Sequence, residues 1–312
     1  MKLPLILSEE VAAAKADKRP IVALESTIIT HGMPYPHNLV TAVAVEGEVR
    51  DGGAVPATVV VKGGNIHVGL TPDELEVLAQ TDDAAKLSRA DLPVALTRGT
   101  TGSTTVAATM IAARLAGVEV FATGGIGGVH RGAESSFDIS ADLEELAQTS
   151  VTVVAAGPKA ILDLPKTLEV LETKGVPVIA YGQDNLPAFW SRDSTLKAPL
   201  RMDSARIIAG SHRMRTLLGI PGGQLIANPI PLADEIPADV LAPHIAQALQ
   251  EADQRMIAAK DVTPFLLQRI YELTKGASLT ANIALIRNNA RLAAEIATAL
   301  NQLDIAPASK GT

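Results

Sequence analysis

The sequence predicts an α/β fold in which helices cover both faces of a mostly central β-sheet, an α/β/α sandwich with a helical C-terminal portion. Short runs rich in Val and Ile alternate with helical stretches through the first two thirds of the chain. In the last third, Ala and Leu recur at helical spacing with little between the segments. We expect a single domain over residues 1–312, with residues 1–7 and 306–312 frayed.

The expected strands are short apolar runs bounded by turn residues. They cover residues 21–24, 57–62, 66–68, 94–97, 118–122, 151–155, 178–181 and 224–227. Gly63 and Gly64 separate the second run from the third, which is typical of a β-hairpin.

The expected helices fill the intervals between the strands. They cover residues 8–17, 37–50, 71–80 and 103–116, and three long segments follow over 237–260, 263–275 and 280–303. The start at Thr71 is the best defined, because a capping Thr is followed by Pro72 and, three residues after the cap, by Glu74.

Charge and composition exclude several classes of function. The formal net charge of −7 and an aromatic content of 3% do not suit a nucleic-acid partner. The absence of cysteine excludes a disulfide scaffold, a Cys-ligated zinc site and a thiol nucleophile. The longest uncharged stretch, 216–233, holds three prolines, and residues 1–7 are too short for a signal peptide. We therefore expect a cytoplasmic protein with no membrane partner.

Common cofactor motifs are missing from the sequence. The glycines at 124–128 do not complete G-x-G-x-x-G, because His130 stands where the third glycine belongs. The phosphate-binding P-loop, H-E-x-x-H and G-x-S-x-G patterns do not occur. The site must therefore be sought in less standard patterns.

Glu25 closes the strand expected over 21–24. Ligands of open α/β sheets bind beyond the carboxyl ends of the strands. A carboxyl group in apolar surroundings keeps its proton to higher pH and can donate it near neutrality. A surface glutamate at a strand end explains the pattern equally well.

A glycine-rich loop and a lysine each follow an expected strand. The glycines of 123–132 allow a backbone to approach a ligand closely, and His130 and Arg131 add potential positive charge. Lys159 follows the strand expected over 151–155, where desolvation would favour a neutral amine able to attack a sugar carbonyl or anomeric carbon. A flexible connection and a solvated lysine are the structural alternatives.

Three further segments carry polar groups with two interpretations each. The hydroxyl-rich segment 98–106 suits an anion at a helix N-terminus, or an ordinary helix cap. Asp138, Ser140 and Asp142 offer oxygen ligands for Mg²⁺ or Mn²⁺, or a cap for the helix that follows. Asn282 can recognise a nucleobase edge through its donor and its acceptor, or be a buried, locally bonded amide.

Taken together, these segments resemble the pseudouridine-5'-phosphate glycosidase family. The matching stretches span residues 23–297 in order: ALESTIITHGMPYPHN, TRGTTGSTTVAATMIAA, FATGGIGGVHRGAESSFDISADL, VVAAGPKAILDLPKTLEVLET and LTANIALIRNNARLAAEIA. The resemblance implies a C-glycosidase that reversibly cleaves pseudouridine 5'-phosphate to uracil and ribose 5-phosphate. It also implies one Mn²⁺ per subunit and a homotrimer.

The resemblance also implies roles for individual residues. Glu25 matches the proton donor, Lys159 the nucleophile and Asp138 the metal residue. With His130 added from the glycine loop, the residues expected to bind the substrate are Lys86, Val106, His130, Ser140, Ala141, Asp142 and Asn282, the last of which faces the uracil. Opening the ribose ring and forming an imine at Lys159 would place an electron-accepting centre next to the bond that breaks.

Two other interpretations remain open. Another Schiff-base lyase or aldolase acting on a phosphosugar would share Lys159 and the glycine loop, but it would not need Asn282 to face a base. A non-catalytic sensor of sugar phosphates or nucleotides would release no product. Uracil release from pseudouridine 5'-phosphate separates the three.

Overall fold

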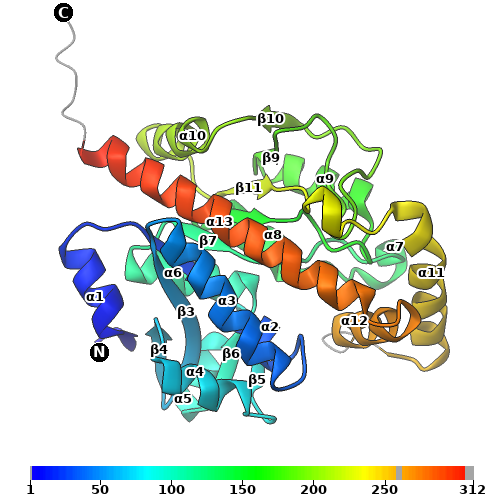
Figure 1. Ribbon diagram of the computed structural model, residues 1–312, viewed down its shortest axis with the longest axis horizontal. Coiled ribbons are helices and arrows are strands. Elements are labelled where there is room, and N and C mark those ends of the chain that lie inside the picture. Colours follow the sequence, from blue (N-terminus) through cyan, green and yellow to red (C-terminus); the bar gives the residue numbers. More distant parts are fainter. Residues whose placement is uncertain (1, 258–261, 306–312) are drawn as a thin grey trace, which may run out of the picture.

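The computed structural model describes residues 2–257 and 262–305, and an 11-stranded sheet forms its centre (Figure 1). The main path of the sheet runs, in spatial order, through β1 (Leu5–Leu7), β4 (Asn65–Val68), β3 (Val55–Lys62), β2 (Ile21–Leu24), β7 (Val120–Ala122), β8 (Thr152–Ala155), β11 (Gln224–Ala227), β9 (Val178–Tyr181) and β10 (Leu200–Met202). Off this path, β6 (Gly102–Thr104) pairs with β3, and β5 (Ala85–Leu87) pairs with β6.

The strands from β3 through β2, β7, β8, β11 and β9 to β10 are parallel to their neighbours. Only the pairs of β3 with β4 and with β6 are antiparallel among the described strands. The segments that follow β2, β7 and β8 therefore leave the sheet at one edge, side by side.

The helices of the first two thirds of the chain connect the strands. They are α1 (Glu9–Ala16), α2 (Thr27–Thr30), α3 (His37–Asp51), α4 (Pro72–Ala79), α5 (Leu92–Arg98), α6 (Val106–Ala116), α7 (Ala133–Ser136), α8 (Ala141–Gln148), α9 (Leu164–Thr173) and α10 (Ala205–Leu217). A 3₁₀ turn (Leu232–Asp234), α11 (Ala238–Gln254), α12 (Val262–Leu273) and α13 (Ala277–Ile305) follow, and α13 packs along α3 and α10 on one face of the sheet (Figure 1).

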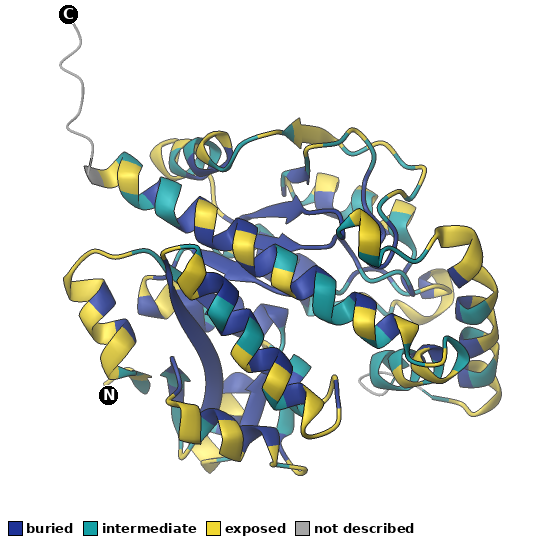
Figure 2. Ribbon diagram, in the orientation of Figure 1, coloured by how far each residue is buried: buried dark blue, intermediate teal, exposed yellow. Residues whose placement is uncertain are grey.

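Alternate residues of the central strands face two hydrophobic cores. In β2, Ala23 packs into the core shared with α6 and α8, whereas Val22 and Leu24 pack into the core shared with α3 and α13. In β8, Val153 packs into the first of these cores and Val154 into the second. The central parallel strands are therefore buried on both faces, and Figure 2 draws them in dark blue, whereas β10 at the edge of the sheet is exposed. The predicted α/β/α arrangement is confirmed.

Most predicted strands and helices appear near their expected positions. The strand predictions for 21–24, 178–181 and 224–227 agree with β2, β9 and β11. The capping box at α4 is present, since the Thr71 hydroxyl accepts from the Glu74 N–H and the Glu74 carboxylate accepts from the Thr71 N–H.

The strand predicted over 94–97 is wrong, because these residues lie in α5. Pro93 occupies the first turn, where its missing N–H costs nothing, and Gly99 ends the helix with a φ of 69°. Val94 lies on the exposed side of the helix.

Two other boundaries also differ from the predictions. The helix predicted over 103–116 begins only at Val106, because Gly102–Thr104 extends as β6 and Thr105 caps the helix. Leu5–Leu7 forms β1 against β4, so the expectation that residues 1–7 are frayed is wrong for these three.

The three long C-terminal helices are present as α11, α12 and α13. The first ends at Gln254, and α13 starts at Ala277, before the predicted Thr280. The end of the predicted helix 237–260 and the tail 306–312 lie outside the described residues. Within the described part of the chain, no helix is long and apolar enough to cross a membrane.

Candidate active site

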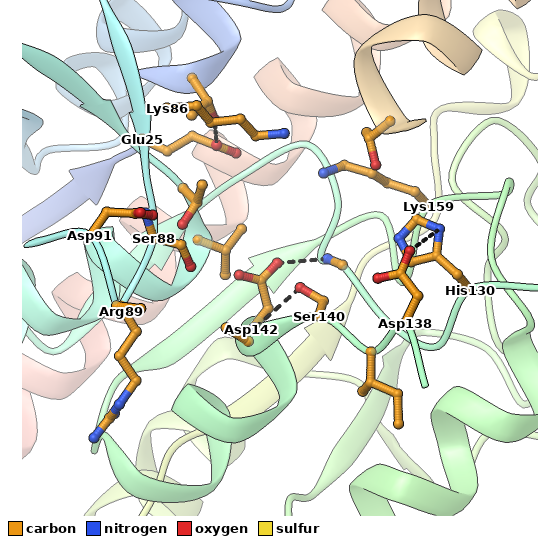
Figure 3. Close-up of a pocket in the computed structure, with 18 of the residues that line it drawn as sticks. Glu25, Lys86, Ser88, Arg89, Asp91, His130, Asp138, Ser140, Asp142 and Lys159 are labelled. Carbon is orange, nitrogen blue, oxygen red and sulfur yellow. Dashed lines mark hydrogen bonds and ion pairs between the residues drawn. The ribbon is translucent and has the colours of Figure 1, made fainter. Parts of the chain in front are cut away.

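A cavity of about 650 Å³ opens at the carboxyl ends of the parallel strands. Glu25 follows β2, the glycine loop 123–132 follows β7, and Lys159 follows β8, so three neighbouring strands bring these groups together. Lys86 of β5 reaches the same cavity, and in Figure 3 Lys86 and Lys159 enter it from opposite sides. The structure thus brings these distant segments of the sequence to one cavity.

Two hydroxyl groups hold the carboxylate of Glu25. Thr27, at the start of α2, donates to Oε2, and Thr123, at the end of β7, donates to Oε1. Thr123 is itself fully buried, and its carbonyl oxygen accepts from Nδ2 of Asn289 on α13 at 2.8 Å. The carboxyl group is thus fixed at the cavity wall, where it can give or take a proton.

Lys159 lies on a loop bound to the glycine loop. Its backbone N–H donates to the Ile126 carbonyl at 3.1 Å, and the Ile126 N–H donates to the Gly157 carbonyl at 3.2 Å. Gly157 has a φ of +84°, and a Cβ there would lie 2.5 Å from the Pro187 carbonyl oxygen, so the turn requires glycine. This turn directs the Lys159 side chain into the cavity.

A second, smaller cavity of about 90 Å³ joins the first. Five residues line both cavities: Glu25, Thr27, Lys86, Lys159 and Thr263. The two cavities therefore meet beside the carboxylate of Glu25 and the amines of Lys86 and Lys159. The smaller cavity is mainly apolar, with Phe189 and Leu285 in its wall, and Asn282 supplies an amide. The site therefore has a large compartment, whose lining holds many charged and hydroxyl side chains, and a small compartment with fewer of them, with the expected proton donor and amine between the two.

Charges of both signs line the large cavity: the basic side chains are Lys86, Arg89 and Lys159, and the carboxylates are those of Glu25, Asp91, Asp138 and Asp142. His130 Nδ1 lies 3.9 Å from Asp138 Oδ2. Burial lowers the pKa of His130; the Asp138 carboxylate opposes this, and the charges of Lys159 and Lys86 lower the pKa further. The lowered pKa favours the neutral ring of His130, so Lys86 and Lys159 carry the positive charge of this neighbourhood.

Two helix N-termini also face the large cavity. Val106 is the first residue of α6 and Ala141 the first residue of α8, and both line the cavity. The free N–H groups of a helix start attract anions. Val106 and Ala141, both predicted to contact the substrate, therefore lie in the cavity wall at these helix starts.

Asp142 joins three parts of the site. Its Oδ1 accepts from the Ala107 N–H of α6 at 3.0 Å, and its Oδ2 accepts from the Gly127 N–H of the glycine loop at 2.8 Å. The Ser140 hydroxyl accepts from the Asp142 N–H and caps α8. Both residues line the cavity, but their hydrogen bonds also position its walls, so the cap interpretation of Ser140 is realised here.

Asp138 is the carboxylate best placed for a metal ion. Its side chain is 37% exposed and lines the large cavity, whereas both carboxylate oxygens of Asp142 are bonded to backbone N–H groups. Among the described residues, no group of three or more His, Cys, Asp or Glu side chains could hold a metal. One carboxylate fits a hard divalent ion that keeps most of its waters or takes oxygens from a phosphate.

Residues 10–299 match the family model described as indigoidine synthase A like protein. The chain belongs to this family. A protein of Jannaschia sp. (strain CCS1) named pseudouridine-5'-phosphate glycosidase is 69% identical, over 96% of this chain and 99% of that one. A protein of the same name from Roseobacter denitrificans (strain ATCC 33942 / OCh 114) is 68% identical, over 96% of each chain. The resemblance seen in the sequence is confirmed.

Solved structures of the family have the same fold. The prealnumycin C-glycosynthase AlnA, in complex with ribulose 5-phosphate, matches with a TM-score of 0.90 and 39% identity, over 97% of this chain and 99% of that one. An indigoidine synthase A-like protein from Thermotoga maritima matches with a TM-score of 0.87 and 30% identity, over 96% of this chain and 97% of that one.

The structure also shows residues of the site that the sequence did not single out. Ser88, Arg89 and Asp91 line the large cavity, and Thr263 of α12 lines both cavities. The first three lie between a strand of three residues that was not predicted and a helix that was mistaken for a strand. No local pattern marks them as neighbours of Glu25.

Proposed function

We propose that this protein is a C-glycosidase that reversibly cleaves pseudouridine 5'-phosphate to uracil and ribose 5-phosphate. The observation that carries the proposal is the meeting of the two cavities at Glu25, Lys86 and Lys159. An acid and an amine there face the junction between a compartment suited to a phosphosugar and one suited to a small ring. The names of the relatives support the same activity.

In this proposal the substrate lies across both cavities. The phosphate lies in the large cavity, against the helix starts at Val106 and Ala141 and near Lys86 and His130. The base lies in the small cavity against Asn282. The bond to be broken then lies next to Lys159 and Glu25.

The reaction proceeds through a covalent bond to Lys159. The neutral amine bonds to C1' of the ribose as the C1'–O4' bond breaks; the new ammonium nitrogen then loses a proton, and O4' takes one up. A proton then adds to C5 of the base while the nitrogen lone pair forms the C=N bond, so that the C1'–C5 bond breaks and uracil leaves. Water hydrolyses the imine to ribose 5-phosphate and restores the amine.

Glu25 carries protons in these steps. Its carboxyl group is held by the hydroxyls of Thr27 and Thr123, which fix its direction towards the junction of the cavities. A positioned general acid contributes about 10²–10⁴-fold to such a reaction.

We further propose that Asp138 holds one Mn²⁺. The ion would supply positive charge beside the phosphate and raise the affinity for the substrate. Asp138 and waters would hold it, since its neighbour Asp142 binds backbone N–H groups with both oxygens.

The activity assay is uracil release from pseudouridine 5'-phosphate, with Mn²⁺ and with EDTA. Release that depends on both substrate and enzyme supports the proposal. Aldol cleavage of a phosphosugar without any uracil release would favour the Schiff-base aldolase interpretation, and binding without turnover would favour the sensor. Asn282 in the small cavity supports the glycosidase over the aldolase, which has no base to hold.

The homotrimer and the cytoplasmic location belong to the same proposal. The resemblance to the family is their support. Light scattering of the purified protein tests the first, and fractionation of cells tests the second.

A further inference from the structure

For two polar side chains of the small cavity, neighbouring residues outside the cavity decide which atom donates and which atom accepts a hydrogen bond. These two side chains are Asn282, on α13, and His31, which follows α2. An amide can turn either its oxygen or its nitrogen to a ligand, and a neutral imidazole can be a donor or an acceptor at either nitrogen. The atom that each side chain turns towards the cavity decides whether the ligand must donate or accept a hydrogen bond there.

Trp190 fixes the orientation of Asn282. The indole is fully buried, and its Nε1–H donates at 2.7 Å to Oδ1 of Asn282. An indole nitrogen can only donate, so the amide atom that faces it must be the oxygen. The Phe189 ring holds the indole in an edge-to-face contact with centroids 4.9 Å apart. Nδ2 of Asn282 therefore remains for the cavity, because it bonds to no other residue in the described part of the chain.

A chain of hydroxyl groups fixes the tautomer of His31. His31 Nδ1 lies 2.6 Å from the Thr30 hydroxyl, which donates to the Ser103 hydroxyl at 2.8 Å. The Ser103 hydroxyl lies 3.3 Å from His31 Nδ1 and donates to the Ala85 carbonyl oxygen at 3.5 Å. Because the Thr30 hydroxyl gives its proton to Ser103, the 2.6 Å contact between Thr30 and Nδ1 needs a hydrogen on Nδ1. Nδ1 then carries the hydrogen, and Nε2 is an acceptor.

The surroundings of His31 keep the ring neutral. Burial, together with the positive charge of Lys86, lowers the pKa of His31 below its ordinary value of 6.5. At neutral pH the ring therefore keeps one proton, and the hydroxyl chain places it on Nδ1.

We propose that Trp190 and Thr30 are positioning residues that select the base. They make the small cavity present one donor, Nδ2 of Asn282, and one acceptor, Nε2 of His31. The cavity then fits a planar heterocycle with a carbonyl oxygen and a ring N–H, and it rejects one with an amino group in place of that carbonyl. This inference rests on the proposed function, because the heterocycle is the base that is released.

The inference is tested by kcat/KM for three C-nucleotides. They are pseudouridine 5'-phosphate and the two analogues in which an amino group replaces one or the other carbonyl of the base. A buried donor that faces an amino group loses its partner, which costs about tenfold or more in binding. We expect the unmodified enzyme to prefer the dicarbonyl base by at least that factor over one or both analogues.

Two variants separate positioning from packing. Asn282→Asp keeps the oxygen that accepts from Trp190 and presents an acceptor in place of the donor, so the preference should reverse. Trp190→Phe removes the indole donor together with part of the buried ring, and it should lower the discrimination about tenfold because the amide can then turn. A purely structural role of Trp190 would lower turnover of all three substrates alike.

The tautomer of His31 is measured separately by ¹⁵N NMR of labelled histidine. We expect a hydrogen on Nδ1 in the unmodified protein and a mixture of tautomers in Thr30→Val. A hydrogen on Nε2 in the unmodified protein overturns the role given to Thr30.

Several kinetic results overturn the role of Trp190. Equal turnover of the three substrates by the unmodified enzyme does so, as does a folded Trp190→Phe enzyme with unchanged discrimination. If Trp190→Phe does not fold, Asn282→Asp decides the question, and an unchanged preference there counts against the inference. Complete absence of uracil release from pseudouridine 5'-phosphate contradicts the proposed function instead.

Discussion

Asp142→Asn should destabilise the fold, because this carboxylate holds the glycine loop to the start of α6. The side chain is 6% exposed and accepts N–H groups of Ala107 at 3.0 Å and of Gly127 at 2.8 Å. Hydrogen bonds to a charged group contribute about 1.5–3 kcal/mol each. Asn keeps one acceptor but turns an amide N–H towards the other backbone N–H, which leaves that buried donor unsatisfied. The expected loss is about 3–4 kcal/mol.

Urea denaturation of the variant and the unmodified protein measures this loss. Asp138→Asn is the matched control, because it makes the same change in a carboxylate of the same cavity that is 37% exposed. The control should change the free energy of unfolding by less than about 0.5 kcal/mol. If Asp142→Asn loses less than about 1 kcal/mol while its KM rises, Asp142 acts on the substrate rather than on the loop, and the structural argument is refuted.

Three further predictions follow from the site and from the opposite end of the sheet. Burial raises the pKa of Glu119, but the neighbouring His212 ring, 3.4 Å away, and two hydrogen bonds from Arg213 outweigh this and lower it from 4.5 to about 2. A lowered carboxylate pKa stabilises the fold above pH 4.5, and this stabilisation is lost as the pH falls towards 2. The free energy of unfolding should therefore fall less between pH 6 and pH 3 in Glu119→Gln than in the unmodified protein, by about 1–2 kcal/mol after solvent screening. Urea denaturation at the two pH values measures this difference, and an equal fall in both proteins contradicts the prediction. EDTA should abolish uracil release and Mn²⁺ restore it, whereas Asp138→Ala should no longer respond to Mn²⁺; full activity of that variant excludes the metal site. Glu25→Gln keeps the shape of the side chain and should lower kcat by about 10²–10⁴-fold; a change in KM alone would indicate a structural glutamate.

The sequence predicted those parts of the molecule that follow from continuous apolar strands. Val151–Ala155 reads as a buried strand because the chain is apolar on both faces there, and a lysine beyond its end must emerge at the edge where Glu25 also lies. The prediction for 94–97 is wrong because Val-Ala-Leu-Thr suits a strand by its side chains. The helix is instead delimited by Pro93 at its start and Gly99 at its end, which act through the backbone.

The rest of the site depends on contacts between distant residues. Trp190 and Asn282 are 92 positions apart, and the hydrogen bond between them needs the packing of α13 against the sheet. Lys86 lies in a strand of three residues, too short for a recognisable pattern. Its place in the site could be expected from the family resemblance but not from periodicity.

Borohydride trapping during turnover tests the central claim most directly, since the claim is a covalent bond between Lys159 and the sugar. The proposal predicts that the enzyme, incubated with pseudouridine 5'-phosphate and reduced, gains the mass of a ribose phosphate less water, plus the two hydrogens added by the reduction. The modified peptide should contain Lys159. Lys159→Ala should bind the substrate, release no uracil and form no adduct. An adduct on Lys86, or uracil release by Lys159→Ala, would show that Lys159 is not the nucleophile.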